Sequence, residues 1–411
     1  MVRFLLALFL AAAAAAQPVS ISQPAAIFQQ VDEMVASLSE ITGWKIERRV
    51  PSEMLSKEKF RKFVDSKMND KSGRKEVRAE EITLKMFGFV PQDFDLVKET
   101  VDLVSEQAAA FYDYNKKRLF ILDSTGEGME QRVALVHELA HALADQHHPL
   151  GKYLHKGSPD DDASTARQAV MEGQATWLTW AYVAKRNGGK AEVPSELIDQ
   201  LTRSVGSDST EFPVFTKAPL YMKESLVFPY NEGLRFQDAV FRKTGREGFD
   251  QVFTRAPEST QQILHPDSYL AGKKPVDVEP PSIQSAVGKK DAKRFHLLTE
   301  GTLGEFDFSM LLRQYVSEKE GAAAASHWRG GAYRVYESKN EKYPVLTFKS
   351  EWDSPESATK FCELYQRVMK GRWKKIQVER TGPEVFTGSG DSGKFRLRCV
   401  GATVESVEGL R

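Results

Sequence analysis

The stretch His137-Glu138-Leu139-Ala140-His141 lies inside a long run of residues with helical periodicity, and the interpretation of the whole chain starts from it. Residues i and i+4 of a helix lie one turn apart on the same face. Two imidazoles at this spacing can reach one zinc ion at about 2.0–2.1 Å, and the glutamate between them can act as a general base. The sequence therefore predicts a helix over about residues 129–148, with His137 and His141 as metal ligands and Glu138 as the catalytic base.

Apolar residues flank this polar stripe on both sides of the predicted helix, with Val136 and Leu143 on one side and Leu135 and Leu139 on the other. A helix that is apolar on both flanks is mostly buried. We therefore expect the narrow polar face to line an internal cleft and not to meet bulk water. The chain has 8 histidines in 411 residues, so a chance match to the motif is on the order of one per cent.

A catalytic zinc site needs a third protein ligand and an open fourth position. Glu172 is the expected ligand, because it is a single carboxylate in an apolar segment of a second predicted helix, about residues 163–186. Such a group is costly to bury unless it is paired or binds a metal. The sequence thus predicts a zinc site made of His137, His141 and Glu172.

Other polar groups near the motif are weaker ligand candidates. His148 lies on the same helix face but too far along the axis to share the ion. His147 and His155 lie at or beyond the helix end and could bend back toward it. Asp145 follows the second motif histidine by one turn, and the sequence leaves two roles open for it, orienting that histidine or facing the surface.

These motifs resemble those of the gluzincins, the thermolysin-like and aminopeptidase-like zinc peptidases, in which a glutamate in an E-G-x-A context follows H-E-x-x-H. Here the glutamate is Glu172, which comes later in the chain than in the common members. A narrower resemblance is to an uncharacterised group of exported prokaryotic proteins classed as metallopeptidases. It rests on the following strings: Phe111-Tyr112-Asp113, HELAHALADQ from His137 to Gln146, Glu172-Gly173, YNEGLRF from Tyr230 to Phe236, STQQILHPDSY from Ser259 to Tyr269, and Trp328-Arg329-Gly330-Gly331.

The resemblance implies a protein or peptide substrate, hydrolysed by water that zinc activates and Glu138 deprotonates. Gluzincins use a tyrosine or histidine to stabilise the oxyanion, and Tyr230 and His265 are the two candidates here. A predicted hairpin over residues 109–122 would place an edge strand beside the active-site helix, where extended substrates pair in this class. The alternative function is a non-catalytic, zinc-binding, peptidase-like module that recognises a protein or cell-envelope partner.

The expected fold class is α+β, with a mostly helical, gluzincin-like catalytic domain that carries a small β-hairpin or sheet beside the active-site helix. A proline-rich stretch over residues 272–281 reads as a linker that extends toward about residue 290. The alternation of helices and strands after it predicts a separate C-terminal α+β domain. The expected boundaries are as follows: signal peptide 1–16, peptidase-like domain 17–285 (an N-terminal helical part at about 25–105 and an active-site core at about 106–270), and C-terminal domain 286–411.

Several properties of the chain bear on its location and partners. Phe4 to Ala16 is an unbroken apolar stretch after a basic residue, which is typical of a cleaved export signal and predicts a periplasmic or secreted protein. No apolar run is long enough to span a bilayer once this signal is removed. Equal numbers of basic and acidic residues, 57 each, argue against nucleic-acid binding. Cys362 and Cys399 are expected either to pair or to remain as two buried thiols, and the oligomeric state is not predicted.

Overall fold

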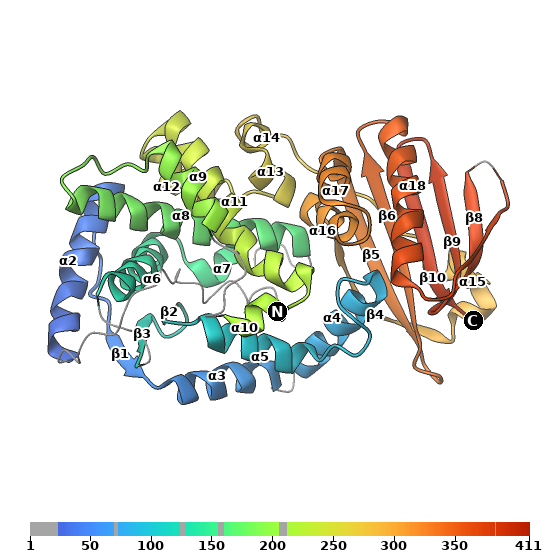
Figure 1. Ribbon diagram of the computed structural model, residues 1–411, viewed down its shortest axis with the longest axis horizontal. Helices are drawn as coiled ribbons and strands as arrows, with labels where there is room; N and C mark the ends of the chain where they lie inside the picture. Colours follow the sequence, from blue (N-terminus) through green and yellow to red (C-terminus); the bar gives the residue numbers. More distant parts are fainter. Residues whose placement is uncertain (1–23, 70–72, 124–127, 155–159, 205–211, 383) are drawn as a thin grey trace.

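The computed structural model describes residues 24–69, 73–123, 128–154, 160–204, 212–382 and 384–411. These residues form an α+β fold, as expected, in which helices dominate the first two thirds of the chain and a seven-stranded sheet the last third (Figure 1). The expected signal peptide and His155 lie outside the described residues. Among the described helices, none has both the length and the apolar character needed to cross a membrane.

The N-terminal part consists of helices around a small three-stranded sheet. Its elements are α2 (Pro24–Thr42), β1 (Ser52–Leu55), α3 (Lys57–Asn69), α4 (Gly73–Phe87), α5 (Leu96–Gln107), β2 (Ala110–Asp113) and β3 (Arg118–Leu122). Strands β2 and β3 form the predicted antiparallel hairpin. The strand order is β1-β3-β2, and β1 pairs with β3 in parallel. Strand β2 is therefore an edge of this sheet.

In its described residues the central part contains helices and no strand, and it includes both predicted helices of the site. Its elements are α6 (Met129–His147), α7 (Leu150–Leu154), α8 (Asp161–Arg186), α9 (Ser195–Ser204), α10 (Pro213–Lys217), α11 (Leu220–Thr244), α12 (Glu247–Thr254), α13 (Thr260–Leu264) and α14 (Pro266–Leu270). Helix α8 packs against both α6 and α11. Residues 273–281, within the predicted linker, form neither helix nor strand. The predicted extension of the linker toward residue 290 is wrong, because α15 begins at Ile283.

The C-terminal part is an antiparallel sheet with the strand order β4-β5-β6-β10-β9-β8-β7. Helix α18 lies along one face of this sheet (Figure 1), and Cys362 on it forms a disulfide with Cys399 on β9. The elements are α15 (Ile283–Ala292), β4 (Phe295–Thr302), α16 (Glu305–Tyr315), α17 (Glu318–Ala325), β5 (Trp328–Ser338), β6 (Pro344–Trp352), α18 (Pro355–Arg372), β7 (Gln377–Arg380), β8 (Val385–Gly390), β9 (Gly393–Val400) and β10 (Thr403–Leu410).

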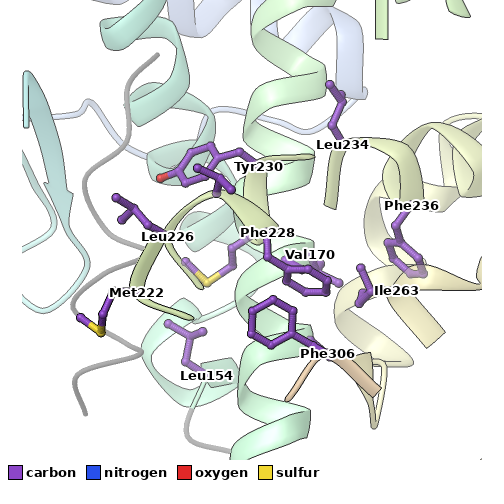
Figure 2. Packing of buried hydrophobic residues seen from close by; sticks show 14 of the residues in the cluster. Leu154, Val170, Met222, Leu226, Phe228, Tyr230, Leu234, Phe236, Ile263 and Phe306 are labelled. Atoms are coloured by element: carbon purple, nitrogen blue, oxygen red, sulfur yellow. The ribbon is translucent and has the colours of Figure 1, made fainter. Parts of the chain in front are cut away.

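The hydrophobic core runs without interruption from the central helices into the C-terminal part. Figure 2 shows Phe228 of α11 beside Phe306 of α16, and the centroids of these two rings are 4.7 Å apart. Both side chains are almost fully buried. The helices that carry the site and the sheet that follows them are thus joined by shared apolar contacts.

Candidate metal centre

Helix α6 carries the H-E-x-x-H motif on its single polar face, and its flanks are buried as the apolar pattern predicts. Val136, Leu139 and Leu143 are completely inaccessible to solvent. The polar face is also enclosed, because His137 is 4% exposed and His141 is 8% exposed. The motif therefore faces the interior of the protein.

The donor atoms of His137, His141 and Glu172 converge at one point. His137 Nε2 lies 2.9 Å from Glu172 Oε2, His141 Nε2 lies 3.2 Å from the same oxygen, and the two imidazole nitrogens are 3.2 Å apart. Ligand atoms of a tetrahedral zinc site with bonds of about 2.0–2.1 Å lie about 3.3–3.4 Å from one another. The three side chains thus come from two helices to a spacing close to, and slightly shorter than, that of such a site.

Glu138 lies beside the two histidines and completes a buried His137–Glu138–His141 group that could hold a metal ion, with ligand atoms within 4.8 Å of one another. The Glu138 carboxylate contacts a backbone amide, whereas the Glu172 carboxylate contacts the two imidazoles. The backbone N–H of Tyr112, on the edge strand β2, donates a hydrogen bond of 2.7 Å to Glu138 Oε2. Glu172 contacts both imidazoles directly, and the geometry therefore separates the two carboxylates into different positions.

Burial and mutual charge set the protonation of the group. Burial raises the pKa of Glu138 to about 8. For Glu172, burial also acts to raise the pKa, but the two adjacent imidazoles outweigh it and bring this pKa to about 2. Burial lowers the pKa of His137. At His141 burial acts in the same direction, but the Glu172 carboxylate overcomes it and raises the pKa of that imidazole.

Close packing of α8 and α11 places Tyr230 near the group. A Cβ on Gly173 would lie 2.0 Å from the carbonyl carbon of Gly233, so the two backbones touch where these glycines meet. Glu172 directly precedes Gly173, and Tyr230 lies about one helical turn before Gly233. The Tyr230 ring stacks on His137, with centroids 5.7 Å apart and planes 26° apart.

His265 lies elsewhere. Its Nε2 is 2.9 Å from Glu305 Oε1, and it lines a pocket with Gln261 and Arg329. The short helix before it, α13, contacts the first turn of α8. There the Thr260 hydroxyl donates a hydrogen bond to the buried carboxylate of Asp162. Glu172 is ten residues further along α8, about 15 Å away along the helix axis. The structure brings Tyr230 to the metal centre but not His265.

The weaker ligand candidates have partners of their own. His147 Nε2 lies 2.8 Å from the backbone oxygen of Lys45, and His148 Nε2 lies 2.7 Å from Asp250 Oδ1. Asp145 is buried, and its carboxylate accepts hydrogen bonds from the hydroxyl of Tyr112 and from the ammonium of Lys117. The sequence left open whether Asp145 faces the surface, and that alternative is wrong because the side chain is buried.

Sequence reasoning did not identify Tyr112 or Lys117 as part of the site's surroundings. Tyr112 lies in the Phe111-Tyr112-Asp113 string, on which the expected resemblance partly rests, and this string was the only sequence signal for it. Lys117 lies in the hairpin turn, where a lysine carries no signal of function. Both contact helix α6 through pairing of distant segments, which periodicity does not predict.

Comparison with protein families found one match, to a domain of unknown function (DUF8575), over residues 293–411. The match covers the C-terminal part from just before β4 to the end of the chain and does not include the metal centre. Searches of the curated proteins and of the solved structures found no match.

Proposed function

We propose that this protein is an exported zinc metallopeptidase of the gluzincin type. The observation that carries the proposal is the meeting of His137, His141 and Glu172 at mutual distances of 2.9–3.2 Å, with the Glu138 carboxylate beside them. Two imidazoles and one carboxylate are the ligand set of thermolysin-type catalytic zinc sites. In this assignment Glu172 is the third ligand and Glu138 remains free to act as a base.

A bound zinc ion supplies a Lewis acid that polarises a carbonyl and lowers the pKa of water. Glu138 takes a proton from the attacking water as oxygen adds to the scissile carbonyl carbon, and it delivers this proton to the amine as the C–N bond breaks. Because burial raises the pKa of Glu138 to about 8, its ionised form needs nearby positive charge at neutral pH. The proposed base therefore depends on the cation held by its neighbours.

Tyr230 is the proposed stabiliser of the negative charge that develops on the carbonyl oxygen. Its ring lies against the imidazole of His137, which supports its choice over His265. The Cys362–Cys399 disulfide supports export, because disulfides persist in oxidising compartments. It agrees with the signal-like N-terminus and with a periplasmic or secreted location.

A second candidate is a zinc-binding module without turnover that recognises a protein or cell-envelope partner. The burial of the group favours it, since Glu138 is 3% exposed and Glu172 is 2% exposed. A substrate can reach these atoms only if the covering segments move. Glu138 favours the peptidase, because a site that only stores zinc has no use for a base beside the ligands.

The two candidates separate in one experiment on the purified chain, with metal content measured by mass spectrometry and turnover on casein and peptide libraries. We expect about one zinc ion per chain, and Glu138→Gln should keep the zinc but lose activity by about 10²-fold or more. Glu172→Gln should lose zinc. Glu232→Gln on α11, where the carboxylate pairs with Arg235, is the matched control and should change neither.

The outcomes have distinct meanings. Zinc without turnover in the wild-type chain would support the binding module. Activity that survives Glu138→Gln would show that this residue is not the base. Zinc content unaffected by Glu172→Gln would remove Glu172 from the ligand set.

A further inference from the structure

The carboxylate of Asp145 is a buried anion near the metal centre that the proposed mechanism does not use. Its side chain is completely inaccessible to solvent. Oδ2 accepts a 2.9 Å hydrogen bond from the hydroxyl of Tyr112 and lies 2.6 Å from Lys117 Nζ, while Oδ1 accepts the backbone N–H of Leu150 at 3.0 Å. The guanidinium of Arg48 is 3.8 Å away. A buried carboxylate is retained only when such partners compensate its lost hydration.

Two of these partners, Tyr112 and Lys117, belong to the β2–β3 hairpin. Lys117 lies in the turn with a φ of 54°, in the left-handed region that residues with a Cβ rarely adopt. In this conformation its ammonium group reaches Asp145. Asp145 therefore ties the hairpin to α6 at two points, one in the strand and one in the turn.

The same hairpin holds the proposed base. The backbone N–H of Tyr112 donates to Glu138 Oε2, and the hydroxyl of the same residue donates to Asp145. Glu138 and Asp145 are seven residues apart, which is two helical turns, so they share one face of α6. Tyr112 thus bridges the two carboxylates, because its backbone N–H donates to Glu138 and its hydroxyl donates to Asp145.

We propose that Asp145 and Lys117 are positioning residues that hold β2 so that the Tyr112 amide orients Glu138. The amide restricts the rotation of the carboxylate by holding Oε2. Neither Asp145 nor Lys117 touches the substrate. This inference rests on the proposed role of Glu138 as a general base.

The test uses the full-length zinc-loaded chain with variants that leave the Tyr112 amide in place. Lys117→Met removes the ammonium and keeps the stem, and Tyr112→Phe removes only the hydroxyl. Lys116→Met is the matched control, because this neighbouring lysine contacts Asp113 at 3.8 Å and not Asp145. Lys117→Arg restores a cation and tests rescue.

Two quantities are measured on each variant. The first is hydrogen–deuterium exchange at the Tyr112 amide, resolved by mass spectrometry, which needs neither metal nor activity. We expect it to be about tenfold faster in Lys117→Met and Tyr112→Phe and unchanged in Lys116→Met. The second is the steady-state kinetics, in which kcat should fall about tenfold while KM and zinc content remain unchanged, because misplacement of a base affects the transition state more than binding. Lys117→Arg should recover most of both.

Unchanged exchange at the Tyr112 amide in both variants would overturn the anchoring by Asp145. Faster exchange with unchanged kcat in an active enzyme would overturn the positioning role. If the zinc-loaded wild-type chain has no turnover at all, the peptidase proposal fails and the positioning of a base fails with it. The exchange data then decide only whether Asp145 holds the hairpin to α6.

Discussion

At the scale of single residues, the chemistry of this protein depends on which polar groups the fold brings together. The sequence offered two candidates for oxyanion stabilisation, Tyr230 first and His265 second. The structure stacks the first on His137 and pairs the second with Glu305. Neither outcome follows from local sequence, because each contact joins residues on different elements.

The pairing of His265 with Glu305 gives a prediction about pH. The hydrogen bond to Glu305 raises the pKa of the His265 imidazole above its ordinary value of about 6.5. A pKa raised by folding stabilises the folded state fully below the unfolded value, and this contribution is lost as pH rises through the folded pKa. NMR titration of ¹³C-labelled histidine should therefore give a midpoint above 6.5 for His265.

The matched variant is Glu305→Gln, in which the His265 midpoint should return toward the ordinary value. His265→Gln identifies the resonance among the eight histidines. A wild-type midpoint at or below 6.5 would contradict the prediction. Because the His265 side chain is 42% exposed, solvent screening should keep the effect on stability small.

At the scale of elements, the candidate metal centre depends on how closely two helices approach. The strings around Glu172 and Tyr230 each contain a glycine, Gly173 and Gly233, and the structure shows why glycine is needed at both positions. A Cβ on Gly233 would lie 2.1 Å from the carbonyl oxygen of Ala169. Only glycine permits this contact between α8 and α11, which sets the distance between Glu172 and Tyr230.

Gly173→Ala should therefore destabilise the protein even though alanine is the better helix former. The gain in helix propensity is at most about 1 kcal/mol, whereas overpacking against a rigid backbone costs about 1–3 kcal/mol or more. A Cβ at 2.0 Å from a backbone atom belongs at the upper end of that range. We expect a net loss of at least about 2 kcal/mol in urea denaturation, together with weaker zinc binding because Glu172 is displaced.

Gly382→Ala is the control for this substitution, because a Cβ there meets nothing within 4 Å. It should leave both stability and zinc content unchanged. Equal stability of Gly173→Ala and the wild-type chain would mean that the helices can separate at little cost. The close contact would then not determine the position of Glu172.

The elements near the site were predictable to the extent that their signals are local. The periodicity and the motif predicted α6, α8 and the β2–β3 hairpin within a few residues. The parallel pairing of β1 with β3 was not predicted, because Ser52 and Leu119 are far apart in the chain. The glycine contact and the Asp145 network were missed for the same reason, since both depend on how separate elements pack.

At the scale of the whole molecule, the C-terminal part contributes to the structure around the site. The hydroxyl of Tyr333 on β5 donates to Asp161 Oδ2 in the first turn of α8. Thr302 on β4 donates to Asp160, the N-cap of the same helix. The family match begins at residue 293, so a unit with relatives of its own is joined here to the helix that carries Glu172.

Phe306 is the apolar counterpart of these polar contacts, and its replacement tests whether the two parts unfold together. It is 3% exposed and packs on Phe228 of α11 and on Tyr221. Phe306→Ala should cost about 3–5 kcal/mol, as for other buried aromatic side chains. Because the core is continuous, we expect hydrogen–deuterium exchange to accelerate both in α11 and in strands β5 and β6.

Phe395→Ala is the control, since this buried residue packs on Trp373 within the C-terminal part. If Phe306→Ala accelerated exchange in the sheet alone, the C-terminal part would be an independent domain, and the contacts at the start of α8 would not transmit stability to the metal centre.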